Sequence, residues 1–328
     1  MTCFYAIAGY SFCIAVDDEG IARLVSRVLS DYRFDLNTAE SEGDPVYPIR
    51  VSAHGFPPSI PKGLDTFEVP FGQCYTDDEK YYLSINDSVI IVDGGGLEVW
   101  IGNTRQARQT SALVSVISYA LETSLRRAGL YQLHGAGVLD PHGKTGMLIV
   151  GGSGSGKTTL TALLASRGWR YLTDDALVLI RDEGTVTARG IRRFFAVSDK
   201  TLAACRWNGT NGALGQPMQS DPSKRRLEPT IAFPSKWIQS CVPKVLLFSS
   251  IRNESTSRIQ TLTPREAMTR LIKFNPWASY DKITARSHLR LLNRLAKQCR
   301  SFSLGAGSDI LLKPSYAEEL VTPLLETT

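Results

Sequence analysis

The chain has 328 residues, of which 43% are hydrophobic and 21% are charged. This length allows one large domain or two ordinary ones, and the apolar content is enough to bury a sizeable core. The formal net charge of +5 is mild for this size, and no basic run with interleaved aromatic residues predicts a nucleic-acid surface. We therefore expect a soluble globular protein without a nucleic-acid partner.

The N-terminal segment, residues 1–20, lacks the basic n-region of a signal peptide, and its apolar stretch stops at Asp17, which is too short to span a bilayer. The six cysteines are scattered singly, with no CxxC pair and no histidine cluster nearby, so neither a zinc site nor a disulfide framework is indicated. These features favour a cytoplasmic location and no membrane partner.

The first third of the chain alternates short strand-like runs with turns. The expected strands are Phe4–Ile7, Ser11–Val16, Tyr81–Ile85 and Ser88–Val92. A helix is expected over Gly20–Tyr32, and the proline-rich segment Asp44–Phe71 is expected to be an irregular connection. Together these elements predict an N-terminal α+β accessory domain over residues 1–115.

Helical periodicity then gives way to strand patterns. Apolar residues recur at three- and four-residue spacing from Ala107 to Gly129, which predicts an amphipathic helix. After a strand containing LHGAGVLD and a breaker at Pro141–Lys144, the continuous apolar run Gly146–Val150 leads directly into glycine-rich sequence. Two buried strands that meet such a loop predict an α/β nucleotide-binding domain over residues 116–328.

The glycine-rich sequence Gly151–Thr158 fits the pattern GxxxxGK[ST] in full. It lies between an apolar strand and the helix-forming run Thr159–Arg167, which is the context that a phosphate-binding loop requires. Glycines let backbone N–H groups turn inward around phosphates, and the helix N-terminus adds its positive end. The motif predicts binding of a nucleoside triphosphate, which we expect to be ATP, with Mg²⁺, and the alternative is a glycine-rich turn that binds nothing.

Individual residues of this loop have expected roles. The candidate nucleotide-binding residues are Gly151, Ser153, Gly154, Ser155, Gly156, Lys157, Thr158 and Thr159. Lys157 would place a positive charge on the transferring phosphate, and Thr158 would offer its hydroxyl to Mg²⁺.

Two adjacent carboxylates follow the next strand. The helix is expected to end at Gly168, and the strand Trp169–Thr173 then leads to Asp174 and Asp175. Adjacent side chains of a strand point to opposite faces, so both can serve one site only if the strand ends or bulges there. One carboxylate would hold Mg²⁺ and the other would take the proton of an acceptor hydroxyl. An Asx turn between strands is the alternative left open.

Histidine and basic residues complete the candidate site. His134 lies at the end of the strand that leads to Gly135–Gly137, where a hydrogen-bonded structural histidine is at least as good an interpretation as a functional one. Guanidinium groups bind phosphates and carboxylates bidentately, although a solvated surface is their commoner fate. The candidate substrate contacts are Arg192, Arg193, Lys224 and Arg225. The segment Asn208–Arg226 is expected to be a long loop beside them.

Structural elements are expected further along the chain. Lys244–Ser250 has the pattern of a buried strand, Thr263–Glu266 has that of a helix start with Thr as N-cap, and Arg286–Cys299 is a basic amphipathic helix. The aromatic-rich stretch Phe274–Tyr280 could contact a peptide, but core packing is the better expectation.

Four segments in this order resemble the HPr kinase/phosphorylase superfamily of P-loop serine kinases. They are LHGAGVL, GGSGSGKTT, SRGWRYLTDDALVL and SFSLGAGSD, and the resemblance runs from about Leu133 to about Pro314. It implies that His134 contacts the phosphates, that Asp175 is the base facing an acceptor serine, and that Asp174 is the carboxylate on the metal side. Members of this family often assemble, so the resemblance also implies a homo-oligomer.

Within that superfamily, the chain lacks the extended signature of the bacterial HPr enzymes and is closer to shorter relatives found beside ribosomal-peptide gene clusters. The resemblance to lasso-peptide precursor kinases implies transfer of the γ-phosphoryl group of ATP to a serine hydroxyl of a peptide or protein, with the C-terminal serine of a precursor as the acceptor. The residues alone leave two alternatives open: a kinase of a small metabolite, and a protein that ATP switches without phosphoryl transfer.

Overall fold

The computed structural model describes residues 1–36, 47–69, 72–77, 80–207, 212–218 and 221–325. Contacts divide the chain into unit 1, Met1–Leu130 with Tyr280–Thr284, and unit 2, Tyr131–Ser279 with Ala285–Thr328. Both units combine helices with β-sheets, so the chain has a mixed α/β fold. In the part of the chain that is described, no helix is both long enough and apolar enough to cross a lipid bilayer.

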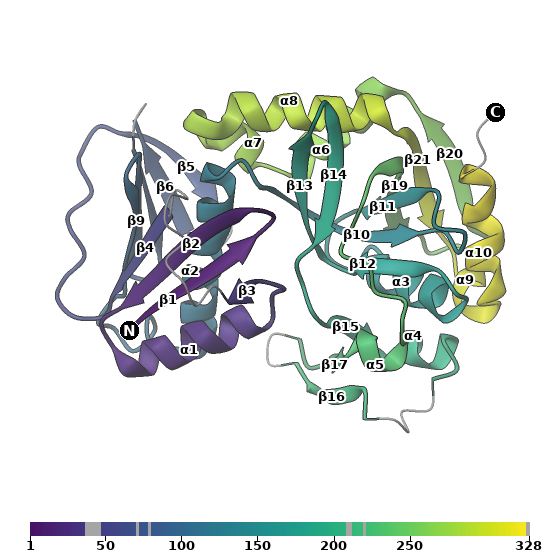
Figure 1. The fold of residues 1–328 in the computed structure, drawn as a ribbon, viewed down its shortest axis with the longest axis horizontal. Coiled ribbons are helices and arrows are strands. Elements are labelled where there is room, and N and C mark those ends of the chain that lie inside the picture. Colours follow the sequence, from purple (N-terminus) through teal and green to yellow (C-terminus); the bar gives the residue numbers. More distant parts are fainter. Residues whose placement is uncertain (37–46, 70–71, 78–79, 208–211, 219–220, 326–328) are drawn as a thin grey trace. The chain divides into compact units, whose positions relative to one another are not determined.

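Unit 1 contains one sheet with the strand order β3-β1-β2-β4-β9-β8-β7-β6-β5, and helices α1 and α2 pack together beside it (Figure 1). Its elements are β1 (Thr2–Ile7), β2 (Tyr10–Val16), α1 (Glu19–Ser30), β3 (Asp35–Leu36), β4 (Tyr47–Ser52), β5 (Asp65–Val69), β6 (Gly72–Thr76), β7 (Tyr81–Ile85), β8 (Ser88–Asp93), β9 (Gly96–Trp100) and α2 (Thr110–Arg127). The helices and strands predicted for this region are confirmed.

One expectation for unit 1 is wrong. The proline-rich segment Asp44–Phe71 is not irregular throughout, because it contains β4 and β5; its residues 44–46 and 70–71 lie outside the described residues. β4 pairs in parallel with β2 on one side and with β9 on the other. These partners are distant in sequence, so local turn signals do not reveal the strand.

Helix α2 sets the end of unit 1. The expected domain boundary at residues 115/116 falls inside this helix, whereas the contacts place the whole of it in unit 1 and divide the chain at Leu130. The physical reason is packing, since α2 contacts α1 and strands β4, β8 and β9.

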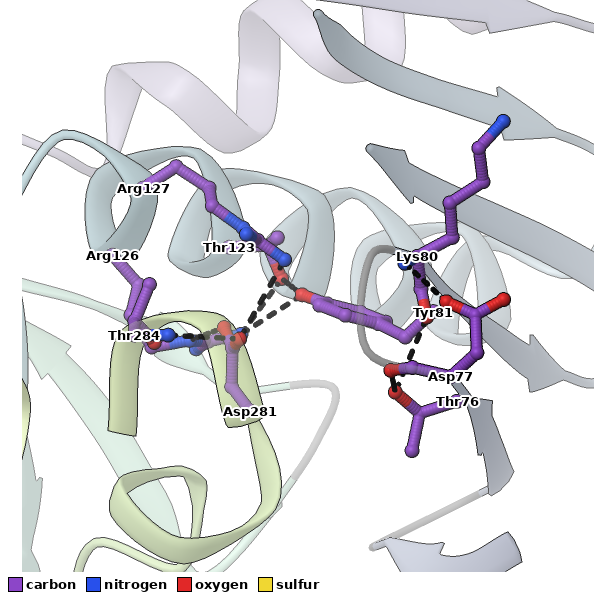
Figure 2. A network of polar contacts seen from close by, with 9 residues as sticks. All are labelled: Thr76, Asp77, Lys80, Tyr81, Thr123, Arg126, Arg127, Asp281 and Thr284. Carbon is purple, nitrogen blue, oxygen red and sulfur yellow. Dashed lines mark hydrogen bonds and ion pairs between the residues drawn. The ribbon is translucent and has the colours of Figure 1, made fainter. Parts of the chain in front are cut away.

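The short segment Tyr280–Thr284 is tied into unit 1 by a buried polar network (Figure 2). Arg126 Nε donates to Asp281 Oδ2 at 2.9 Å, and Arg126 Nη2 donates to the Tyr81 hydroxyl at 3.0 Å. Arg127 Nη2 lies 3.5 Å from the other oxygen of Asp281, whose side chain is fully buried. Burial opposes ionisation, but the two guanidinium groups hold the pKa of Asp281 below its usual range.

Unit 2 is built on a mixed sheet with the order β18-β14-β13-β10-β11-β19-β21-β20, to which β12 adds by pairing with β10, and a smaller sheet, β15-β17-β16 (Figure 1). Its strands are β10 (Tyr131–Leu139), β11 (Gly146–Val150), β12 (Arg170–Thr173), β13 (Ala176–Asp182), β14 (Thr185–Gly190), β15 (Phe195–Ser198), β16 (Leu214–Pro217), β17 (Lys224–Leu227), β18 (Ser240–Cys241), β19 (Pro243–Ile251), β20 (Arg258–Leu262) and β21 (Arg300–Ala306). Its helices are α3 (Lys157–Ser166), α4 (Asp199–Ala204), α5 (Pro229–Ala232), α6 (Pro264–Lys273), α7 (Trp277–Tyr280), α8 (Lys282–Gln298), α9 (Asp309–Leu312), α10 (Ser315–Val321) and the 3₁₀ turn η1 (Thr322–Leu324), with α7 and α8 crossing the division between the units.

The mixed sheet of unit 2 has a core on each face, as strand alternation requires. Met147 and Ile149 of β11 pack in one core with residues of α3 and α10. Leu148 and Val150 pack in the other core with residues of α6 and α8. The strand is therefore buried on both sides, which explains its unbroken apolar sequence.

Three neighbouring strands of this sheet, β11, β19 and β21, run parallel to one another. Their carboxyl ends consequently meet at one edge of the sheet, where ligands of α/β proteins commonly bind. The glycine-rich loop, Gly151–Thr158, follows β11 at this edge and leads into α3.

Most other predictions for unit 2 are confirmed, including the Thr263 N-cap, which forms a capping box with Glu266. The expectation of one long loop over Asn208–Arg226 is wrong, because β16 and β17 lie within it and pair with each other and with β15. Residues 208–211 and 219–220 of that segment lie outside the described residues.

Candidate functional site

The conformation of the glycine-rich loop requires its glycines. Gly154 and Gly156 have φ angles of 76° and 90°, in the region that residues with a side chain rarely adopt. At Gly151 a Cβ atom would lie 2.5 Å from the Ser155 hydroxyl oxygen and 2.6 Å from the carbonyl oxygen of Ser249. The loop thus ends at Gly156 as the N-cap of α3, with the first N–H groups of the helix directed toward the loop.

Lys157 lies under the loop and is only 5% exposed. Its ammonium group donates to the carbonyl oxygens of Gly151 at 2.9 Å and Gly152 at 3.0 Å. It also lies 3.0 Å from Nε2 of His134 on β10. Burial lowers the pKa of Lys157, and the nearby carboxylates of Asp174 and Asp175 oppose that shift.

Asp174 and Asp175 occupy a break in the strand ladder. β12 and β13 both pair with β10, but the two aspartates lie between them, and the register shifts at Gly137/Val138. Asp174 and Asp175 thus lie outside the regular strands, and both line one cavity. The condition under which adjacent residues can serve the same site is therefore met here.

Asp174 is fully buried beside the start of α3. Its Oδ2 accepts from the Thr158 hydroxyl at 2.8 Å and from the backbone N–H of Ala196 at 3.2 Å. Its Oδ1 has no hydrogen-bond partner among the described residues. Burial raises the pKa of Asp174 to about 6, although Arg192 opposes the rise.

Asp175 is engaged on both carboxylate oxygens. His134 Nδ1 lies 3.2 Å from Oδ1, and Arg192 Nη1 donates to Oδ2. Burial opposes ionisation, but Arg192, His134 and Lys157 together hold the pKa of Asp175 below its usual range. The Arg192 guanidinium also lies 4.1 Å from the centre of the Phe194 ring, which fixes its plane.

The contacts of His134 define its proton position. An ammonium group can only donate, so Nε2 of His134 accepts from Lys157, and the ring proton lies on Nδ1 toward Asp175. Burial and the neighbouring cations lower the pKa of His134, which favours this neutral form. The imidazole therefore connects the lysine of the loop to the second aspartate.

These groups surround a cavity of about 520 Å³. The predicted site residues that line it are His134, Ser153, Gly154, Ser155, Gly156, Lys157, Thr158, Thr159, Asp174, Asp175, Arg192 and Lys224. Gly151 does not line the cavity, but its carbonyl oxygen accepts a hydrogen bond from the Lys157 ammonium group. The structure thus brings the loop, the paired aspartates and the histidine strand to one place.

Two predicted substrate contacts lie elsewhere. Arg193 is exposed and is not part of the cavity wall, which its neighbour Arg192 lines. Arg225 alternates with Lys224 along β17, and its Nε donates to the carbonyl oxygen of Gly215 at 3.2 Å. In an extended segment only every second residue of a basic run can face the same cavity.

Sequence reasoning missed several residues of the cavity wall. They are Ala196, Ser198, Thr201, Met218, Asp221 and Ile251. Ala196 contributes a backbone N–H to Asp174, which no side-chain pattern could reveal. Asp221 pairs with Lys224 at 3.2 Å, and the acid three residues before a base was the signal available for that pair.

The residues of the cavity suit a magnesium ion that is shared with phosphate oxygens. No group of three or more His, Cys, Asp or Glu side chains among the described residues could hold a metal alone. Mg²⁺ commonly binds through one or two carboxylates together with substrate phosphates and water. The Thr158 hydroxyl and the unpartnered Oδ1 of Asp174 are oxygen ligands of that kind.

Comparison with known proteins shows structural similarity only. No family model and no curated protein matches this chain. Among solved structures, the chain is similar to the Hpr(Ser) kinase/phosphatase from Coxiella burnetii, with 12% sequence identity, a TM-score of 0.27, and coverage of 40% of this chain and 77% of that chain. A similarity at this level supports no conclusion about activity, so the function has to be inferred from the site itself.

Proposed function

We propose that this protein is an ATP- and Mg²⁺-dependent kinase that transfers the γ-phosphoryl group to the serine hydroxyl of a peptide or protein. One observation carries the proposal: a glycine-rich loop with its lysine and threonine shares a cavity with a carboxylate, Asp175, whose two oxygens face His134 and Arg192. Phosphoryl transfer needs a phosphate cradle and an oriented acceptor, and this cavity offers groups for both.

On the nucleotide side, the glycine-rich loop acts as a phosphate-binding loop in this proposal. Lys157 exchanges one of its contacts with Gly151, Gly152 or His134 for a phosphate oxygen, since its three N–H groups are all engaged within the protein. Thr158 and Asp174 would hold Mg²⁺, which supplies positive charge that neutralises the phosphate oxygens.

On the acceptor side, Asp175 orients the serine hydroxyl and takes its proton. The serine O–H bond breaks as the new P–O bond forms, and ADP leaves with the electron pair of the broken P–O bond. Because Arg192 and His134 keep Asp175 ionised, this carboxylate is a weak base, and its main role is to accept a hydrogen bond from the serine hydroxyl. Positioning and charge neutralisation therefore supply most of the catalysis.

As the specific acceptor, we propose the C-terminal serine of a lasso-peptide precursor. The support is charge at the cavity wall, which the guanidinium of Arg192 and the ammonium of Lys224 line together with Asp175. Such cations bind the α-carboxylate of a C-terminal residue, which an internal serine lacks.

The test is transfer of phosphate from γ-labelled ATP to three synthetic peptides based on precursor-like sequences encoded beside the gene. The first ends in serine, the second ends in alanine, and the third ends in serine amide. We expect phosphate, located by mass spectrometry, on the terminal serine of the first peptide, none on the second, and weaker transfer to the third because the carboxylate is neutralised.

Other results would redirect the proposal. Equal transfer to the free acid and the amide would overturn the C-terminal specificity but keep a serine kinase. Nucleotide binding without transfer to any peptide would contradict the peptide-kinase proposal and favour a metabolite kinase or an ATP-switched binding protein.

A further inference from the structure

A second cavity of about 570 Å³ adjoins the first one in unit 2. The two cavities share wall residues from the glycine-rich loop, the start of α4 and the end of β19: Ser155, Gly156, Thr159, Ser198, Thr201 and Ile251. From these residues and the groups beyond them, we infer that the second cavity is the binding site for the base and ribose of the nucleotide. This inference rests on the proposed function, because it takes the phosphates to lie on the glycine-rich loop.

The position of the cavity follows from the parallel strands. The glycine-rich loop follows β11, the segment Arg252–Ser255 follows β19, and Gly307–Ser308 follows β21. All three connections contribute to the cavity wall at the carboxyl edge of the sheet. A ligand whose phosphates lie on the first connection would extend its nucleoside along the next two.

The chemistry of the wall suits a flat heterocycle attached to a sugar. Leu304 of β21 and Ile310 and Leu311 of α9 give the cavity an apolar part. Ile251, which is 65% exposed at the shared wall, offers an apolar surface that a stacked ring would cover. Asn253 and Ser308 add amide and hydroxyl groups that can bind the edge of a base or the ribose.

The wall is also held in shape by backbone contacts. The N–H of Arg252 donates to the carbonyl of Ala306 at 2.9 Å, and the N–H of Ser308 donates to the carbonyl of Glu254 at 3.0 Å. A Cβ atom at Gly307 would lie 2.7 Å from the carbonyl carbon of Thr256, so only glycine permits this approach. A cavity formed in this way is available to a ligand without large rearrangement, as ligand sites usually are.

The size of the cavity is consistent with this ligand. Its volume of about 570 Å³ lies within the range of about 300–1,000 Å³ that is common for small-molecule sites. Because apolar and polar groups line the same space, the wall suits a nucleoside better than an aliphatic chain.

The test separates the nucleoside from the phosphates. Leu311→Trp would fill the second cavity, whereas the neighbouring Leu312, 81% exposed and absent from the wall, gives the matched control Leu312→Trp. Affinities of the full-length proteins for ATP and for tripolyphosphate, each with Mg²⁺, are measured by calorimetry. We expect Leu311→Trp to weaken ATP binding by at least about tenfold, with Leu312→Trp unchanged and tripolyphosphate binding equal in all three proteins.

A milder variant guards against a folding defect. If Leu311→Trp lowers the thermal midpoint, Leu311→Ala is used instead, and the expected loss of ATP affinity is about threefold to fivefold. Unchanged ATP binding in a folded Leu311→Trp protein would overturn the inference. Equal affinity of the wild-type protein for ATP and tripolyphosphate would also overturn the inference, but it would not contradict phosphate binding at the glycine-rich loop. Failure of the wild-type protein to bind either ligand would instead overturn the proposed function, and the inference with it.

Discussion

Each unit of this protein buries an aspartate beside arginine side chains, and the two aspartates differ in how their carboxylate oxygens are paired. In unit 1, Asp281 has no exposed surface and faces two arginines, and its pKa is low (Figure 2). In unit 2, Asp174 is equally buried, yet burial raises its pKa to about 6 and one of its oxygens has no partner among the described residues. The carboxylate of Asp281 is therefore held by charges of the fold, whereas Asp174 keeps one oxygen available for a ligand.

The largest effect should come from breaking the compensated network. Asp281→Ala leaves Arg126 and Arg127 buried without their carboxylate, so we expect a loss of about 3–5 kcal/mol in the stability of unit 1. The measurement is urea unfolding combined with hydrogen exchange in α2 and β7. The control is Asp65→Ala, which removes an exposed ion pair. The Asp65 carboxylate lies 3.0 Å from the Lys282 ammonium group, and its loss should cost less than about 1 kcal/mol of stability. Equal effects of the two changes would contradict a structural role for the buried network.

In the site of unit 2, the next largest effect should follow removal of the loop cation. Lys157→Ala takes away the charge that would stabilise the transferring phosphate, and we expect kcat/KM to fall on the order of 10²–10³. The matched control is Lys144→Ala, because Lys144 is exposed in the turn before β11. Kinetics that do not distinguish the two variants would argue against phosphate binding at the loop.

Removing the charge of Asp174, in contrast, is expected to stabilise the free protein. Since the folded-state pKa of Asp174 is about 6 against a usual 3.8, its contribution to stability is present at low pH and is lost as the pH rises through 6. Asp174→Asn imitates the protonated acid, so at pH 8 it should stabilise the free protein by about 1–3 kcal/mol while weakening binding of Mg²⁺ with ATP.

Thermal unfolding of the wild-type protein and of Asp174→Asn at pH 5 and pH 8 measures this effect. The stability gained through Asp174→Asn should be smaller at pH 5 than at pH 8, because the wild-type carboxyl of the folded protein is already protonated at pH 5. A variant that is less stable than the wild type at pH 8 would show that Asp174 is satisfied by a partner in the fold.

The smallest effect concerns the electrostatic support of Asp175. Arg192 lowers the pKa of this carboxyl, so Arg192→Ala should raise it. Asp175 must be ionised to accept the hydroxyl proton, and the acidic limb of the kcat/KM profile should therefore move to higher pH. Arg193→Ala, at the exposed neighbour, should leave the profile in place. If the acidic limb of the kcat/KM profile stays at the same pH in Arg192→Ala, Asp175 is not the group whose titration produces it.

The sequence predicts features whose cause is local and misses those that depend on distant partners. The glycine-rich loop and α2 could be predicted, because glycine and periodicity are local signals, whereas the adjacent acids Asp174 and Asp175 leave open whether the strand breaks there. The strand β4 could not, since it forms between β2 and β9, which come from before and after it in the chain. The backbone N–H of Ala196 that donates to Asp174 could not be predicted either, because a backbone group does not appear in the pattern of side chains.

The basic candidates show the same limit. Composition cannot tell Arg192 from Arg193 or Lys224 from Arg225, and only the direction of each extended segment separates them. The second cavity was likewise beyond sequence reasoning, because its wall combines the connections that follow three strands far apart in the chain.

The central claim is that one cavity holds both the phosphate cradle and the carboxylate that receives the acceptor proton. Single-turnover transfer from γ-labelled ATP to the serine peptide, measured together with ATP affinity in Asp175→Asn, tests it most directly. The account predicts a loss of about 10²–10⁴ in the transfer rate with ATP affinity nearly unchanged, while Asp182→Asn, at an exposed position of β13, behaves as wild type. Transfer at the wild-type rate in Asp175→Asn would contradict the claim and remove this carboxylate from the reaction.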